Sequence, residues 1–348
     1  MTTPVFDGHN DALSRLWCAN GDPVADFSTN AGHVNVDACR TGGMAGGFFA
    51  IYSPSTRAEY DFTDFDPAVF DMPLPPMMDE GFALGAAIGQ AGIARKLHDA
   101  GSIEIVTDAS SLGRSFVGDP ITCILHLEGA DCIGPDLLAL DALYSLGLRS
   151  IGIVWSRPTI FGDGVPFAFG RDGDTGPGLT DDGKRLVERC KELGVIIDTS
   201  HLTMKGFWDL AEAGIPLVAT HSNAIEICNT TRNLTDEQLR AIGETDGIAG
   251  LNFGTIFLDS AAWKTGMCGI DACIRHLAHM IDIAGENHVA IGSDFDGAPM
   301  PDGIGSAADL QNLAAAMEAA DFGTELINKI THENWLDFLN QQFEGPNT

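Results

Sequence analysis

Basic residues are scarce in this chain. Its 348 residues include 19 lysines and arginines against 49 aspartates and glutamates, so the formal net charge is −30. A charge of this sign and size repels nucleic-acid phosphates and anionic membrane surfaces, which excludes nucleic acid as a partner. We interpret most of the charge as a solvated acidic surface that favours solubility.

Long hydrophobic runs are missing too. No stretch approaches the ~20 apolar residues of a transmembrane helix, so no membrane span is expected. The N-terminus lacks the basic and apolar regions of a signal peptide, and His9 and Asp11 stand where one would lie. We therefore expect a cytoplasmic protein.

Paired cysteines are absent as well. The chain has eight cysteines but no Cys-x-x-Cys motif. Several of them lie inside apolar strand or helix patterns, so we interpret them as buried free thiols. They are Cys18, Cys39, Cys123, Cys132, Cys190, Cys228, Cys268 and Cys273.

The chain does contain a repeated pattern of short apolar runs followed by helical patterns. From residue 120 onward this alternation is typical of βα units that close on a parallel sheet. Residues 1–348 are therefore expected to form a single α/β domain, a (β/α)8 barrel of the TIM type. We place the eight strands near residues 4–8, 46–52, 121–127, 149–154, 195–199, 216–220, 247–252 and 288–293.

About 70 residues separate the second and third predicted strands, too many for an ordinary barrel connection. We infer an insertion over residues 53–81, which are rich in Asp and Pro, followed by a helix near 82–100. The insertion has three interpretations: an active-site lid, an oligomer contact, or a covering loop without a catalytic role. Residues 305–343 have helical patterns and are expected to close the barrel from outside.

Three helices carry further signals. Thr180 is placed to cap one helix, and Thr235 with Gln238 matches a capping box at the start of another. In the third, an apolar stripe predicts a buried face. The stripe consists of Ile270, Ile274, Leu277 and Ile281.

Metal-binding residue types follow many of the predicted strands. Because the C-terminal ends of barrel strands meet at one face, the residues just after them are expected to converge. His9 and Asp11 follow the first strand two positions apart, so both can point the same way. The later strands lead to Glu128, His201, His221 and Asp294.

Three histidines and three carboxylates at one barrel face suit divalent ions of the zinc type. Two ions fit this number of ligands better than one, with Glu128 as the bridge between them. The other ligands would be His9, Asp11, His201 and His221. Two ions about 3.5–4 Å apart lower the pKa of a shared water towards ~7 and polarise a substrate carbonyl. Asp294 would accept the proton of the attacking water and pass it to a leaving amine.

The motifs around these residues resemble the renal (membrane) dipeptidase family of zinc metallopeptidases, which has an amidohydrolase-type barrel. The likeness runs from about residue 5 to 340. The matching motifs are Asp7–Asp11 (Asp-Gly-His-Asn-Asp), Glu128-Gly129, Ile197–His201 (Ile-Asp-x-x-His), His221-Ser222, Arg232-Asn233 and Gly292–Gly297 (Gly-x-Asp-Phe-Asp-Gly).

The resemblance implies a dipeptidase with two Zn²⁺ ions, bridged by Glu128 and a hydroxide, that tolerates a D residue at the C-terminal side of its substrate. The implied ligand sets are His9, Asp11 and Glu128 at one ion, and Glu128, His201 and His221 at the other. Asp294 would be the catalytic acid/base. Arg232 would bind the C-terminal carboxylate of the dipeptide, because the guanidinium fork matches a carboxylate. A homodimer, frequent in the family, is also implied.

Trp155 is a departure from the family. After the fourth strand the family usually has a histidine that polarises the substrate carbonyl, and Trp155 occupies that position here. Tryptophan can donate one N–H but cannot become cationic. We predict that Trp155 lines the substrate pocket, and that oxyanion stabilisation rests more heavily on the metals.

Two other functions stay open. A related metal-dependent amidohydrolase, acting on N-acyl amino acids or lactams, would need Arg232 for the same purpose. A metal-holding binding protein is the non-enzymatic alternative. Asp294 argues against it, because a metal trap needs no group for proton transfer.

Other polar residues receive structural interpretations. We assign His276 and His279 to a polar surface stripe of a helix, and Asp296 to a turn or cap. His126 is interpreted as a group behind the ligands, and Asp198 as a residue that orients the histidine that follows it.

Overall fold

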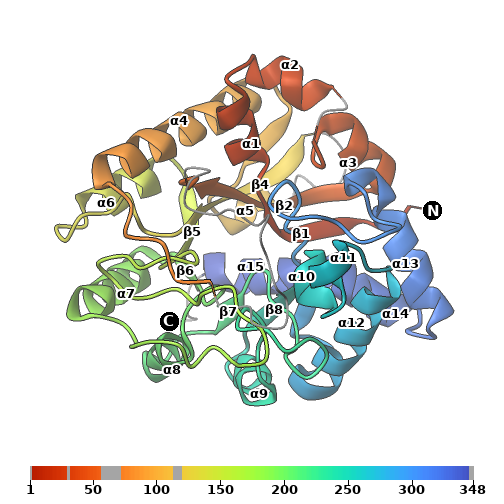
Figure 1. Cartoon of the computed structure of the whole chain (residues 1–348). Helices are drawn as coiled ribbons and strands as arrows, with labels where there is room; N and C mark the ends of the chain where they lie inside the picture. Colours follow the sequence, from red (N-terminus) through yellow and green to blue (C-terminus); the bar gives the residue numbers. More distant parts are fainter. Residues whose placement is uncertain (1, 30–31, 56–71, 113–119, 345–348) are drawn as a thin grey trace.

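The computed structural model describes residues 2–29, 32–55, 72–112 and 120–344. These residues form a ring of strands enclosed by helices, which Figure 1 shows end-on. Within the described part of the chain, no helix is long and apolar enough to cross a membrane.

Eight parallel strands form a closed barrel, which confirms the predicted (β/α)8 fold. The ring closes where β2 pairs with β4, in register from Gly46 opposite Thr122 to Tyr52 opposite Glu128. The barrel strands are β1 (Val5–Asn10), β2 (Met44–Tyr52), β4 (Ile121–Glu128), β5 (Leu148–Gly152), β6 (Ile196–Asp198), β7 (Val218–Ala219), β8 (Ile248–Leu251) and β9 (Val289–Ile291).

The long connection between β2 and β4 contains a strand that was not predicted. This strand, β3 (Ile103–Ile105), pairs with β4 outside the ring. It follows α4 (Glu80–Asp99), which matches the helix predicted near 82–100, and precedes α5 (Ala109–Leu112). Of the insertion predicted over 53–81, residues 56–71 lie outside the described residues, so its role stays a prediction.

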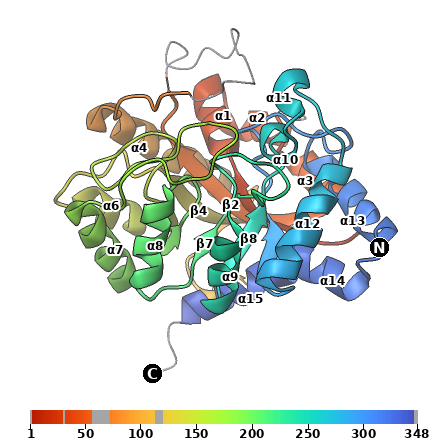
Figure 2. The ribbon, with the colours of Figure 1, turned by 60° about the horizontal axis from the view of Figure 1, so that its bottom comes forward.

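Helices surround the barrel on its outer side (Figure 2). Two predicted helix starts are confirmed: Thr180 accepts a hydrogen bond from the Gly183 N–H, and Thr235 and Gln238 make both bonds of a capping box. The surrounding helices are α1 (Ala12–Ala19), α2 (Pro23–Ser28), α3 (Val36–Gly42), α6 (Leu138–Ser145), α7 (Asp181–Leu193), α8 (Met204–Glu212), α9 (Asp236–Glu244), α10 (Thr255–Leu258), α11 (Ala262–Thr265) and α12 (Asp271–Ala284).

The buried face of α12 differs from the predicted stripe. Of the predicted residues only Leu277 is fully buried, and His276 is buried beside it. The surface assignment of His276 is therefore wrong, because its Nδ1 accepts from the Ala224 N–H and its Nε2 contacts the Leu258 carbonyl at 3.0 Å. These two backbone partners make the burial of a polar ring possible. His279 lies nearer the surface, against Asp236.

The C-terminal part of the chain, from residue 307 to 344, is mainly helical, in agreement with the helical patterns predicted over 305–343. Its last helix, α15, lies below the barrel in Figure 2, at the end where the strands begin. Trp335 is fully buried there with Phe6 and Phe48, and its Nε1 donates to the Ile291 carbonyl at 2.8 Å. The C-terminal elements are η2 (Ala307–Asp309), α13 (Leu310–Ala319), α14 (Thr324–Asn328), the π-helical η3 (Lys329–Glu333) and α15 (Asn334–Glu344).

Gly8 lies inside the first strand and not at its end. The first strand was predicted near residues 4–8, but β1 continues through Gly8 to Asn10. A Cβ atom on Gly8 would lie 2.6 Å from both the Thr220 carbonyl oxygen and the Trp335 ring. Glycine is required because the strand passes too close to its neighbours for a side chain.

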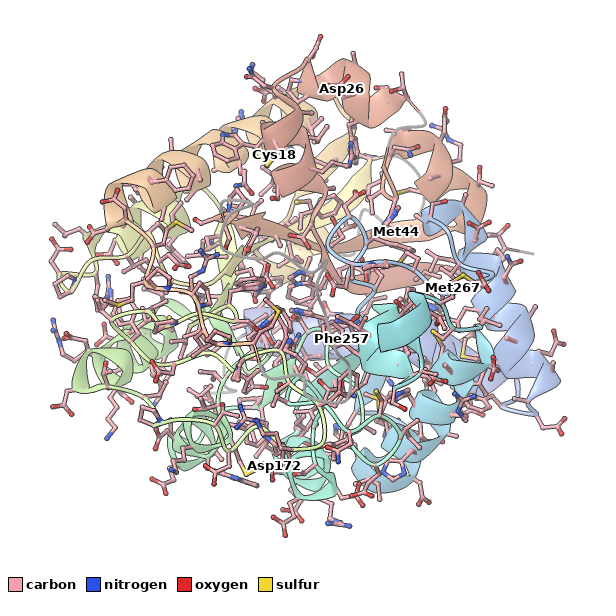
Figure 3. All side chains as sticks on the ribbon, viewed as in Figure 1. Cys18, Asp26, Met44, Asp172, Phe257 and Met267 are labelled. Atoms are coloured by element: carbon pink, nitrogen blue, oxygen red, sulfur yellow. The ribbon has the colours of Figure 1, made fainter. Side chains whose placement is uncertain are left out.

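All eight cysteines are free, and six of them are buried. This confirms buried free thiols for most of the set. Cys18, labelled on α1 in Figure 3, is the exposed exception, and Cys268 is half-buried.

Candidate active site

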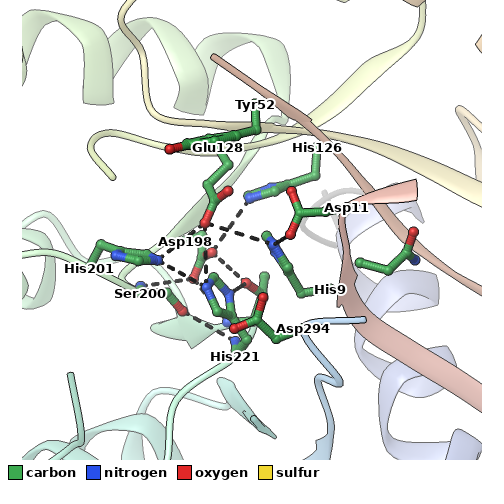
Figure 4. Close-up of polar contacts among 12 residues, drawn as sticks. His9, Asp11, Tyr52, His126, Glu128, Asp198, Ser200, His201, His221 and Asp294 are labelled. Carbon is green, nitrogen blue, oxygen red and sulfur yellow. Dashed lines mark hydrogen bonds and ion pairs between the residues drawn. The ribbon is translucent and has the colours of Figure 1, made fainter. Parts of the chain in front are cut away.

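The residues predicted to bind metal meet at the C-terminal end of the barrel (Figure 4). His9 comes from β1, and its Nε2 lies 3.5 Å from Oδ2 of Asp11, the residue that begins α1. The same nitrogen lies 3.8 Å from Oε1 of Glu128, at the end of β4. Side chains from two strands and a helix start thus face one point.

Glu128 is the centre of this cluster. Its Oε1 lies 3.2 Å from Nε2 of His201 and 3.5 Å from Nε2 of His221. Since the same oxygen also faces His9, one carboxylate contacts the histidines of both predicted ligand sets. This is the position that a bridging ligand would need.

The donor set fits a metal ion. Two groups of potential ligands have donor atoms within 4.8 Å of one another: His9 with Glu128 and His221, and His9 with Asp11 and Asp294. Among the described residues, both ring nitrogens of His9 and Oδ1 of Asp11 are buried without a hydrogen-bond partner. Buried polar atoms are rarely left unpaired, and imidazole and carboxylate donors match a zinc-type ion.

The pKa values of three groups in the cluster are raised. Burial raises the pKa of Glu128 to about 8 and that of Asp294 to about 6. Burial opposes protonation of His9, but the charges of Glu128, Asp11 and Asp294 outweigh it and raise the His9 pKa to about 10. A bound cation would compete with protons for these groups.

Hydrogen bonds from behind orient two of the histidines. The Ser156 hydroxyl lies 2.9 Å from Nδ1 of His201, and the Thr220 hydroxyl lies 2.8 Å from Nδ1 of His221. Such partners direct the other ring nitrogen towards a metal. Neither Ser156 nor Thr220 was identified from the sequence, because a lone hydroxyl residue carries no pattern.

Asp198 supports a different histidine from the expected one. Its Oδ2 accepts from the Thr220 hydroxyl at 2.5 Å, and its Oδ1 accepts from the Thr220 N–H at 2.9 Å. Asp198 thus acts on His221 through Thr220, not on His201. The sequence points only to the neighbour along the chain, whereas the pairing of β6 with β7 brings Thr220 closer.

His126 lies behind the ligands, as interpreted from the sequence. Its Nδ1 is 2.9 Å from the Ser150 hydroxyl, its Nε2 is 3.6 Å from Oδ2 of Asp198, and its ring centroid is 5.5 Å from that of His9. Burial lowers the pKa of His126 to about 3, so the ring is neutral.

Asp294 is held by the backbone and by an amide. It follows β9 with φ of 60°, its N–H donates to the His9 carbonyl at 3.0 Å, and Oδ2 accepts from Asn252 at 2.9 Å. A non-glycine residue in this conformation is strained, and such strain is common at functional sites. Asn252 was not identified from the sequence.

Asp7 ties the two halves of the site together. It is buried and accepts from both the N–H and the hydroxyl of Ser293, at 2.7 and 2.8 Å. This joins β1, which bears His9, to the residue before Asp294. Asp7 is part of a matching family motif, but the sequence alone predicted no role for it.

A cavity of about 660 Å³ opens beside the cluster. Glu128, His201 and Asp294 line it together with aromatic side chains. Trp155 is one of them, 5.9 Å from the His201 ring, and its contact with substrate stays a prediction. Phe257, labelled in Figure 3, is another.

Arg232 is almost completely buried beside the cluster. It is 4% exposed, its Nη2 donates to the His221 carbonyl at 3.0 Å, and its Nη1 donates to the Ser222 hydroxyl at 3.3 Å. Its Cζ is 5.4 Å from the Phe257 ring centroid. Across the described ranges no carboxylate lies within ion-pair distance of this guanidinium, which leaves a buried positive charge beside the site.

Asp296 has the structural role expected of it. Its Oδ1 accepts from the His33 N–H at 2.7 Å, and its Oδ2 pairs with Arg15 Nε at 3.0 Å. These contacts fasten the loop after β9 to the segment before α3 and to α1.

Comparison with known families agrees with this geometry. The family model described as membrane dipeptidase, Peptidase family M19, matches residues 1–344. The chain therefore belongs to the membrane dipeptidase family, and it is a metallopeptidase of the dipeptidase class. This confirms the resemblance inferred from the motifs.

Individual relatives cover most of the chain. A crystal structure of the dipeptidase AC, a metallo peptidase, is 44% identical with a TM-score of 0.94 and covers 99% of this chain and 100% of its own. A metallo peptidase from Rhodobacter sphaeroides, liganded with a phosphinate mimic of the dipeptide L-Ala-D-Ala, is 44% identical with a TM-score of 0.93. The match covers 98% of this chain and 100% of that one. An uncharacterized protein in the pqqA 5′ region of Klebsiella pneumoniae is 40% identical over 253 residues, which are 72% of this chain and 93% of that protein.

Proposed function

We propose that the protein is a binuclear zinc dipeptidase that hydrolyses the peptide bond of small dipeptides. The observation that carries this proposal is the position of Glu128, whose Oε1 lies 3.2 to 3.8 Å from the Nε2 atoms of His201, His221 and His9. One carboxylate oxygen that faces three imidazoles is suited to bridge two ions.

The residues divide into two ligand sets that share Glu128. His9 and Asp11 complete one set, and His201 and His221 complete the other. When bound, the two ions supply Lewis acidity and lower the pKa of a water to near neutrality. Hydrogen bonds with Ser156 and Thr220 orient His201 and His221, the two histidines of the second set.

Asp294 is the proposed acid/base. Its raised pKa, about 6, keeps it near the range in which it can take a proton from water and return it to the leaving amine. The Asn252 amide donates to Oδ2 and leaves Oδ1 for the proton. The φ of 60° directs the side chain into the cavity, among the metal-facing groups.

Arg232 is proposed to bind the C-terminal carboxylate of the substrate. Its buried charge has no ion-pair partner within the described parts of the chain, and a buried charge is costly unless an opposite charge compensates it. A dipeptide carboxylate would provide that compensation. Acceptance of a D residue at the C-terminal side is proposed from the L-Ala-D-Ala mimic bound to the Rhodobacter sphaeroides relative.

A substrate panel tests the proposal. Protein depleted of metal and then reloaded with zinc is assayed on L-L and L-D dipeptides and on N-acylated amino acids, with metal analysis of the same sample. We expect two zinc ions per chain and turnover of the dipeptides. Turnover of N-acyl substrates alone would favour the alternative amidohydrolase, and metal binding without any turnover would favour the binding protein.

Three further expectations stay predictions. They are a single barrel domain over residues 1–348, a cytoplasmic location and a homodimer.

A further inference from the structure

Four aromatic rings follow one another along the cavity wall. They are Tyr52, Trp155, Phe167 and Phe257, and all four line the cavity. Successive ring centroids are 5.3, 5.7 and 6.0 Å apart. Rings at these separations support one another and give the cavity a stiff apolar wall.

Arg157 lies behind one end of this wall. Its side chain is 1% exposed, and its Cζ lies 5.0 Å from the Trp155 ring centroid and 5.5 Å from that of Tyr52. The guanidinium is therefore buried against two rings that themselves line the cavity. Stacking of this kind fixes the plane of a ring as well as its position.

The same side chain joins the ends of three adjacent barrel strands. Its Nη2 donates to the Ser53 carbonyl at 2.6 Å and to the Tyr52 hydroxyl at 3.2 Å, both at the end of β2. Its Nε lies 3.5 Å from Oδ1 of Asp131, which follows β4. Arg157 itself follows β5, next but one to Trp155.

The ion pair with Asp131 is a poor source of stability. Both residues are buried, and within the described ranges neither Asp131 oxygen accepts a hydrogen bond. Buried pairs with incomplete hydrogen bonding are often no better than apolar residues of similar size. The arrangement is better explained by its effect on the adjacent wall.

We propose that Arg157 is a positioning residue that holds Tyr52 and Trp155 against the substrate and so sets the affinity for its N-terminal side chain. This rests on the proposed function, in which Arg232 binds the C-terminal carboxylate at the Phe257 end of the wall. The opposite end then faces the N-terminal residue of the dipeptide. A bulky apolar side chain there would depend on the wall, whereas glycine would not.

The test compares two dipeptides that differ only in the N-terminal residue, leucine or glycine. Two variants are used: Arg157→Lys, which keeps the charge beside Asp131, and the double change Arg157→Met with Asp131→Leu, which leaves no unpaired buried charge. For both we expect KM of the leucine substrate to rise about tenfold with kcat within about twofold, because uniform binding is lost. KM of the glycine substrate should change little.

Arg149→Met is the matched control. Arg149 is also an arginine of the β5 segment, stacks on Tyr144 with Cζ at 4.1 Å, and donates to the Thr107 carbonyl at 3.0 Å, away from the cavity. It should leave both KM values unchanged. The emission of Trp155 is obtained as the difference between the spectrum of each protein and that of its Trp155→Phe derivative. This emission spectrum should shift in the Arg157 variants and not in the Arg149→Met control.

The outcomes separate the two proposals. A parent protein inactive on both dipeptides overturns the proposed function, and this inference with it. An active parent whose folded double variant keeps both KM values within about twofold of the parent overturns the role of Arg157 alone.

Discussion

Nε2 of His201 lies 3.1 Å from Nε2 of His221, and both nitrogens face one oxygen of Glu128. Burial lowers the pKa of both histidines well below the ordinary value, so both rings are neutral at neutral pH. With Nδ1 of each ring engaged by a hydroxyl, the Nε2 atoms form a pair of donors directed at one place. A cation bound between the two nitrogens would relieve the repulsion of their lone pairs.

Removal of metal should abolish turnover and lower stability together. Ions that bind only the folded state stabilise it by about 3–4 kcal/mol when the free ion concentration is about 100 to 1,000 times the dissociation constant. Thermal unfolding with and without a chelator, followed by zinc readdition, measures this. Glu128→Gln is expected to remove most of the difference in melting temperature between the two states, because it alters the ligand that both ions share. Equal melting temperatures in both states would contradict the metal assignment.

The metal-free protein should lose stability as pH rises from 6.5 to about 8. His9, with its pKa raised from 6.5 to about 10, and Glu128, raised from 4.5 to about 8, bind protons more tightly in the folded state. Groups with a raised pKa stabilise the fold below their ordinary pKa and lose that contribution as pH rises through the raised value. Urea unfolding across this range measures the effect. The zinc-loaded protein, whose ligands are already deprotonated, is the control.

Asp294→Asn should lower kcat by about 10²–10⁴-fold while dipeptide binding persists, because general acid/base catalysis contributes about this much. Asp296→Asn is the matched control, since this nearby carboxylate is tied to His33 and Arg15. Asp296→Asn should keep kcat within about tenfold of that of the parent protein. Steady-state kinetics on both variants test this assignment. Full activity of Asp294→Asn would show that another group transfers the proton.

Arg232→Met should weaken the binding of dipeptides far more than that of their C-terminal amides. Truncating one side of a buried charge pair costs about 2–5 kcal/mol, or at least 30-fold in affinity. The amide substrates act as an internal control, because they carry no carboxylate for the guanidinium. Comparable losses for acid and amide would assign Arg232 a purely structural role.

Thr220→Val should weaken zinc binding by about 10- to 100-fold, because it breaks the hydrogen-bonded chain from Asp198 to His221. Thr199→Val is the control: that hydroxyl is also buried but donates to the Val218 carbonyl at 2.7 Å. Competition with a chromogenic chelator reports metal affinity directly. Similar affinities in the two variants would argue against the orienting role.

The sequence patterns predicted the barrel and its polar mouth because both depend on local regularities. Apolar runs mark the strands, and residues such as His9 and Glu128 follow them at their C-terminal ends. The supporting contacts could not be predicted in the same way. Asp198 acts through a residue of the adjacent strand, and Arg157 joins three strand ends, so their roles depend on pairing across the ring.

Two corrections have the same physical origin. His276 was assigned to the surface because polar residues usually lie there, yet two backbone groups of other segments make its burial favourable. Gly8 was interpreted as a strand end, although its role is to let Thr220 and Trp335 approach. In both cases the deciding neighbours lie more than 15 positions away along the chain.

The contact of Trp335 with Phe6 and Phe48 also bears on how the protein is made. Residues from the first two barrel strands complete their packing only with a side chain from the last described helix. During synthesis, the floor of the barrel therefore stays open until residue 335 has left the ribosome. Growing chains are expected to remain protease-sensitive until that point, long after all the metal-facing residues have emerged.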